Sequence, residues 1–107
     1  MPFIDVKASC GITAEQELRL KEGLGEAIRR IPGKDESRLM ISFQGDQHMW
    51  YAGGNDGVTV MVQTAIYGTT TPEAIEDFGQ AAVGLMRREL GADNVYLRMS
   101  QGTDWAF

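Results

Sequence analysis

The chain has 107 residues, a length that fits a single domain over residues 1–107. Ten Lys and Arg against fifteen Asp and Glu give a net charge of −5, which argues against a general nucleic-acid binder because such a protein needs a basic face. No apolar run approaches the length of a membrane span, and the first residues lack the pattern of a signal peptide. The single cysteine excludes an internal disulfide, so we expect a cytoplasmic location.

The first half of the chain predicts a strand, a helix and a second strand. Residues 3–7 have the composition of a short strand. Thr13 and Gln16 have the spacing of a capping box, which predicts the start of a helix over 14–31. Residues 39–43 predict the second strand. The apolar residues of the helix share one face: Leu20, Leu24, Ala27, Ile28 and Ile31.

The second half repeats this order of elements. Residues 58–66 predict a strand, and Thr71 as N-cap with Pro72 at the first helical position predicts a second helix. Gly91 suits the residue just after that helix, and 95–99 predict a last strand. The apolar face of the second helix consists of Ala74, Ile75, Phe78, Ala82, Leu85 and Met86.

Each half is therefore a βαβ unit, which predicts an α+β fold with a parallel strand pair in each half and right-handed crossovers. A short edge strand is expected over 48–52, between two glycine-containing turns. Residues 39–41 and 60–62 are apolar in succession, so we expect both faces of the sheet to be covered. Either each helix covers one face, or both lie on one face and partner subunits bury the other; periodicity does not choose between these.

Few residues suggest catalytic chemistry. His48 is the only histidine and no cysteine cluster exists, so we expect no metal site, and no phosphate-binding loop motif is present. Pro2 follows the initiator methionine directly, and removal of Met1 would give Pro2 a free secondary amine. Burial would lower the pKa of that amine and make it a base near neutrality. The alternative is that Pro2 is only a rigid start to an edge strand.

Several short segments, by their order and spacing, resemble the tautomerase superfamily, in particular its macrophage migration inhibitory factor branch. The resemblance covers nearly the whole chain. The segments that carry it are Met1-Pro2-Phe3-Ile4, Gly33-Lys34, Asp46-Gln47-His48-Met49, Gly53-Gly54, Ala65-Ile66-Tyr67-Gly68, Asp93-Asn94-Val95-Tyr96, and the aromatic residues Trp105 and Phe107.

This resemblance implies a fold and a set of site residues. The fold would be a mixed four-stranded sheet with both helices on one face and short edge strands, assembled as a homotrimer. Pro2 would be the catalytic base, Lys34 would bind a substrate carboxylate, and the backbone of Ile66 would meet the same end of the substrate. Tyr96 would reach into the pocket from a neighbouring subunit, and Phe3 would flank the proline. Whether Trp105 or Phe107 lines the site stays open.

The implied activity is keto–enol isomerisation of a 2-oxo acid such as a phenylpyruvate-like substrate, without a cofactor. The chain departs from the mammalian cytokine by carrying Arg38 and Arg98 where that protein has tyrosine and asparagine, and by lacking its CxxC motif. Two further cations in the pocket would favour a small anionic substrate. The alternative is that Arg38 and Arg98 lie on a solvated or ion-paired face. The alternatives are a proline-dependent hydratase, decarboxylase or dehalogenase of small acids, and a non-catalytic trimeric binding protein if Met1 is retained.

Overall fold

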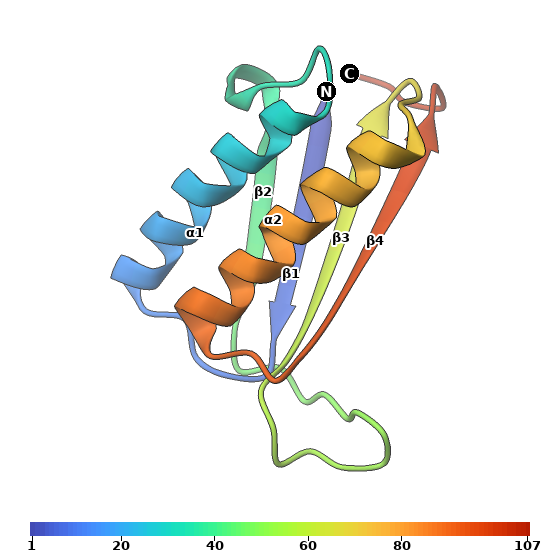
Figure 1. Cartoon of the computed structure of the whole chain (residues 1–107). Helices are drawn as coiled ribbons and strands as arrows, with labels where there is room; N and C mark the ends of the chain where they lie inside the picture. The colour runs from blue at the N-terminus through green and yellow to red at the C-terminus, as the bar shows by residue number, and fades with distance from the viewer.

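A computed structural model describes all 107 residues as a four-stranded sheet that carries two helices on one face (Figure 1). The strand order is β2-β1-β3-β4, with β1 parallel to β2, β3 parallel to β4, and β1 antiparallel to β3. The predicted α+β fold of two βαβ units is thus confirmed. The elements are β1 (Pro2–Ala8), α1 (Ala14–Ala27), the 3₁₀ turns η1 (Ile28–Arg30) and η2 (Glu36–Arg38), β2 (Met40–Gln44), β3 (Thr59–Tyr67), α2 (Pro72–Leu90) and β4 (Asn94–Gly102).

The first helix begins as predicted and ends earlier. The Thr13 hydroxyl accepts from the Gln16 amide at 3.1 Å, and the Gln16 side chain accepts from the Thr13 amide at 2.8 Å. The regular α-helix ends at Ala27, and the last turn tightens into η1. Ile31 then adopts an extended conformation, because a residue that precedes proline avoids the helical region. The predicted helix over 14–31 therefore divides into an α-helix and a 3₁₀ turn.

The second helix has the predicted ends. The Thr71 hydroxyl accepts from the Ala74 amide at 3.1 Å, and Pro72 occupies the first helical position. Gly91 follows the helix with a φ of 64°, a left-handed conformation that costs glycine no steric strain. The helix itself runs to Leu90, four residues beyond the apolar face that predicted it.

Alternation along the strands separates a covered face from an open face. On the covered face Ile4, Val6, Val60 and Val62 are at most 1% exposed, and they form the core together with the buried faces of the helices. The residues between them point away from the helices, since successive side chains of a strand alternate. Both helices thus lie on one side of the sheet (Figure 1), and within one chain nothing covers the other side.

The open face of the sheet carries polar residues between its apolar ones. Ser42, Asp5, Gln63 and Arg98 are paired in register across all four strands, so they form one polar row over the middle of that face. The two apolar runs place Met40 and Met61 on this same face, one on either side of the polar row. The open face therefore combines apolar ends with a polar centre.

The segment between β2 and β3 forms a loop that extends beyond one end of the sheet (Figure 1). The short strand predicted over 48–52 does not form, and the loop contains only a single bridge between Tyr51 and Gly54. A strand needs a partner for its hydrogen bonds, and within one chain no other strand lies beside the loop. No helix of the chain has the length and apolarity required to cross a membrane.

Candidate functional site

Pro2 is the first residue of β1, one of the two central strands, and it is buried. It lies opposite Ile66 near the end of β3. The preceding residue is tied to the same strand, since the Met1 carbonyl accepts from the Tyr67 amide at 3.1 Å. This end of the sheet therefore brings the start of the chain against the end of β3.

Two cations surround this end of β1. Lys34, in the turn between η1 and η2, donates from Nζ to the Tyr67 carbonyl at 2.8 Å. Arg38 is the last residue of η2, and Leu39 separates it from β2. Burial, followed by the charges of Lys34 and Arg38, lowers the pKa of the Met1 amine below its ordinary value. The Met1 amine is therefore driven toward its neutral form.

Tyr67 and Phe107 form an aromatic pair at this end of the sheet, and the sequence did not predict their contact. Their rings meet edge to face at 6.0 Å with an interplanar angle of 83°. Phe107 is 82% exposed, so its outer surface is free to contact another molecule. The C-terminus lies at the same end of the sheet as the N-terminus (Figure 1). In the sequence, Tyr67 belongs to the segment Ala65-Ile66-Tyr67-Gly68, in which only Ile66 was assigned a role. The role of Ile66 was the only indication that Tyr67 lies near the site. Trp105 is half-buried and has no aromatic partner.

Phe3 follows Pro2 in the strand and is half-buried on the opposite face of the sheet. It is paired in register with Met40 of β2 and Ala65 of β3. Its backbone therefore flanks the proline, whereas its side chain belongs to the open face. It could contribute to a site there only together with another subunit.

Tyr96 and Arg98 lie elsewhere within one chain. Tyr96 is paired with Met61, and Met61 lies five positions before Ile66 in β3, which corresponds to about 17 Å along the strand. Arg98 is paired with Gln63 in the polar row of the open face. The structure therefore brings together Pro2, Lys34, Arg38 and Ile66, but neither Tyr96 nor Arg98.

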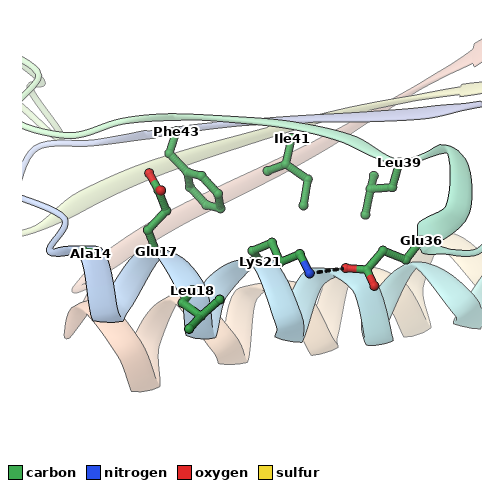
Figure 2. Close-up of a pocket in the computed structure, with 8 residues that line it drawn as sticks. All are labelled: Ala14, Glu17, Leu18, Lys21, Glu36, Leu39, Ile41 and Phe43. Carbon is green, nitrogen blue, oxygen red and sulfur yellow. Dashed lines mark ion pairs between the residues drawn. The ribbon is translucent and has the colours of Figure 1, made fainter.

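A separate groove lies between α1 and β2, with a volume of about 800 Å³ (Figure 2). Leu39, Ile41 and Phe43 extend from β2 and its approach toward the helix, and Lys21 is paired with Glu36 at 3.1 Å across one end. None of the residues predicted for the catalytic site lines this groove. Because its one lysine is already neutralised, the groove offers no free cation for an anionic substrate. No group of three or more His, Cys, Asp or Glu side chains is placed to hold a metal ion.

Comparison with solved structures identifies the fold. MIF2 of Leishmania major superimposes with a TM-score of 0.91 over 100% of this chain and 93% of that one, at 17% sequence identity. A fused 4-OT symmetric trimer matches with a TM-score of 0.83 over 94% of this chain and 87% of that one, at 13% identity. Pt0534 inactivated by 2-oxo-3-pentynoate matches with a TM-score of 0.76 over 98% and 91%, at 18% identity.

The chain has the fold of the tautomerase superfamily, in the form found in homologues of macrophage migration inhibitory factor. The resemblance predicted from the sequence motifs is thus confirmed at the level of the fold. No family model matches the sequence, and no curated protein matches it. At identities below 20% these matches establish architecture, and function has to be argued from the site.

Proposed function

We propose that the protein is a small-molecule tautomerase that interconverts the keto and enol forms of a 2-oxo acid, with Pro2 as general base. The observation that carries this proposal is the buried start of β1 beside Lys34 and Arg38. After removal of Met1, burial and these two cations would keep the Pro2 amine neutral, the form that a base needs. The inactivation of Pt0534 by 2-oxo-3-pentynoate adds support, since that compound is itself a 2-oxo acid.

The reaction follows from these groups. Lys34, helped by Arg38, would hold the substrate carboxylate, because charge-assisted hydrogen bonds to carboxylates are strong. The Pro2 nitrogen would take a proton from the carbon beside the carbonyl and return it to the carbonyl oxygen, which gives the enol with no net gain or loss of atoms. The proline ring cannot rotate about its N–Cα bond, so the nitrogen is oriented before the substrate arrives.

The proposal includes a homotrimer, the state in which Tyr96 and Arg98 could take part. Both residues lie on the sheet face that the helices leave open, and a face of mixed apolar and polar character is suited to a subunit contact. The fused 4-OT protein, which shares this fold, is a symmetric trimer. In this arrangement Tyr96 of one subunit would complete the pocket around Pro2 of the next, and Arg98 would supply a further cation for the substrate.

The test is turnover of phenylpyruvate by protein whose loss of Met1 has been verified by intact mass. Processed protein should isomerise the substrate, and protein that retains Met1 should be slower by about 10²- to 10⁴-fold, because its Pro2 nitrogen is an amide and cannot act as a base. Pro2→Ala keeps a free amine and should fall between these two, with an unchanged melting temperature.

Equal turnover by processed and Met1-bearing protein would refute the role of Pro2. If processed protein instead consumes halogenated acrylates or hydrates small unsaturated acids and leaves phenylpyruvate untouched, the site belongs to a different reaction of small acids. Binding of 2-oxo acids without turnover of any substrate would assign a non-catalytic binding function.

A further inference from the structure

Lys34 and Arg38 lie at the two ends of one short segment that leads into β2. The Lys34 amide donates to the Ile31 carbonyl at 3.0 Å, which closes a turn after η1. The Leu39 amide donates to the Glu36 carbonyl at 3.1 Å, which closes η2 around Arg38. The placement of one cation relative to the other therefore depends on the residues that join these two turns.

The middle of this segment lies against α1. Glu36 pairs with Lys21 at 3.1 Å (Figure 2), and a Cβ on Gly25 would lie only 2.7 Å from the Glu36 Oε2 atom. Gly25 thus leaves the room in which the Glu36 carboxylate lies over the helix. Glu36 is therefore directed toward α1, and its charge is already paired.

Asp35 is a carboxylate between the two cations in the sequence, and it pairs with neither. The four ion pairs of the chain include none of Lys34, Asp35 and Arg38. The Asp35 Oδ1 atom instead accepts from the Ser37 amide at 2.9 Å and from the Ser37 hydroxyl. These hydrogen bonds make Asp35 the N-cap of η2 and direct its carboxylate along the turn. Both cations are therefore left without an acidic partner, although a carboxylate is adjacent to Lys34.

The same hydrogen bonds keep Asp35 charged. The bonds from Ser37, followed by the charges of Arg29 and Arg38, lower the pKa of Asp35 below its ordinary value. Asp35 is exposed, so water and salt screen part of its charge. The carboxylate is therefore ionised at any pH at which an amine base titrates.

The charge of Asp35 acts on the amine at the start of the chain in the opposite sense to the two cations. Burial and then the charges of Lys34 and Arg38 lower the pKa of the Met1 amine, whereas the charge of Asp35 raises it. After removal of Met1 the terminal amine would belong to Pro2, one residue further along the chain. Other titratable groups at this end of the sheet are Tyr67, Asp104 and the α-carboxylate of Phe107.

We propose that Asp35 is a positioning residue, which closes η2 on Ser37 and so holds Lys34 and Arg38 beside the start of β1 with both charges free for the carboxylate of the substrate. This inference rests on the proposed function, in which these two cations hold a 2-oxo acid near Pro2. Asp35 itself does not touch the substrate and acts through the two cations.

The decisive comparison is between Asp35→Ala and Asp35→Asn, in protein whose loss of Met1 has been verified by intact mass. Asparagine caps a helix about as well as aspartate, whereas alanine has no acceptor. Both variants lack the charge, so the ratio of their KM values isolates the cap. With phenylpyruvate as substrate, KM of Asp35→Ala should be about 3- to 10-fold above that of Asp35→Asn, the range for loss of one cap, and kcat should change less.

The pH profile of kcat/KM tests the charge. Both variants remove the carboxylate that stabilises the protonated amine, so the lower limb of the profile should move to lower pH. The matched control is Glu36→Gln, which removes a carboxylate from the same turn on the side that faces α1. It should leave both the lower limb and KM in place. All three variants should stay folded by circular dichroism, because both positions are exposed.

Equal KM values for the two Asp35 variants would overturn the inference, and so would a lower limb that moves as far in Glu36→Gln as in Asp35→Asn. Either result in an active parent protein leaves the role of Pro2 intact. A processed parent protein without turnover refutes the proposed function, and binding of phenylpyruvate measured by calorimetry then tests the inference by itself. Kd of Asp35→Ala should exceed that of Asp35→Asn by the same factor, and equal Kd values would overturn the inference. A parent protein that does not bind the compound would refute both.

Discussion

Lys34 and Lys21 show how the partner of a side chain decides whether its charge is available. The Lys21 ammonium lies 3.1 Å from a carboxylate oxygen of Glu36. The Lys34 ammonium takes part in none of the four ion pairs of the chain and donates only to the Tyr67 carbonyl. A neutral carbonyl leaves the positive charge uncompensated. Lys34 is therefore free to bind an anion, whereas Lys21 is not.

We predict that Lys34→Met raises KM for a 2-oxo acid by about 10- to 150-fold, the effect of losing a hydrogen bond to a charged group. The positive charge of Lys34 lowers the pKa of an amine at the start of β1, so its removal should also raise the pH at which the basic form of Pro2 appears. The measurement is kcat/KM as a function of pH, and its lower limb should move to higher pH. The matched control is Lys21→Met, which should leave both KM and the profile unchanged, and identical behaviour of the two variants would exclude Lys34 from the site.

At the scale of elements, two helical glycines face different surroundings. A Cβ on Gly23 of α1 would lie 2.6 Å from the Leu85 Cδ2 atom of α2, and Leu85 is only 6% exposed. A Cβ on Gly84 of α2 would meet only the Arg88 guanidinium, at 3.4 Å. Gly23 therefore permits the close contact between the two helices. Gly84 has no such role.

We predict that Gly84→Ala stabilises the protein by about 0.5–1 kcal/mol, the helix propensity that glycine lacks. Gly23→Ala gains the same propensity but forces a methyl group into the helix contact, which typically costs about 1–3 kcal/mol, so the net effect should be a loss of up to about 2 kcal/mol. Melting temperatures measured at equal protein concentration should shift in opposite directions. A stabilised Gly23→Ala would mean that Leu85 moves aside without cost.

Signals that act over short distances in the chain predicted the elements well. The Thr13–Gln16 capping box and the Gly91 helix end depend on partners within four residues, so the sequence alone could indicate them. Contacts between distant segments left no such signal. Phe107 packs on Tyr67 forty positions away, and Lys34 entered the site only through the family resemblance. The prediction of a strand over 48–52 was wrong for the same reason. The local sequence does not show whether a partner strand is present.

At the scale of the whole molecule, the sheet has a helix layer on one side only. The open face carries half-buried Met61 and exposed Tyr96, and also the polar row of Ser42, Asp5, Gln63 and Arg98. A subunit contact over this face can bury the apolar ends, but charged residues in its centre need water or partners of opposite charge. We therefore expect an interface that is packed around a polar centre.

We predict a homotrimer with about three times the 11.8 kDa mass of the chain in sedimentation equilibrium at micromolar concentration. Met61→Glu adds a charge to the apolar part of the open face and should dissociate the assembly. Glu76→Gln, on the solvent-facing side of α2, is the control and should leave the assembly intact. A parent protein that sediments as a monomer would contradict both the assembly and a pocket that uses the neighbour's Tyr96.

The position of Pro2 at the start of a central strand has a consequence for protein synthesis. β1 cannot take its place until the residues of β3 exist, and at about 5–20 residues per second Ile66 leaves the peptidyl-transferase centre roughly 3–13 s after Pro2. During that interval the nascent N-terminus is open to an aminopeptidase. Once the chain has folded, the Met1 carbonyl is bonded to the Tyr67 amide and its peptide bond to Pro2 is held against β3. Each molecule would therefore either acquire its reactive amine on the ribosome, before it has an active site, or keep Met1 and never acquire it.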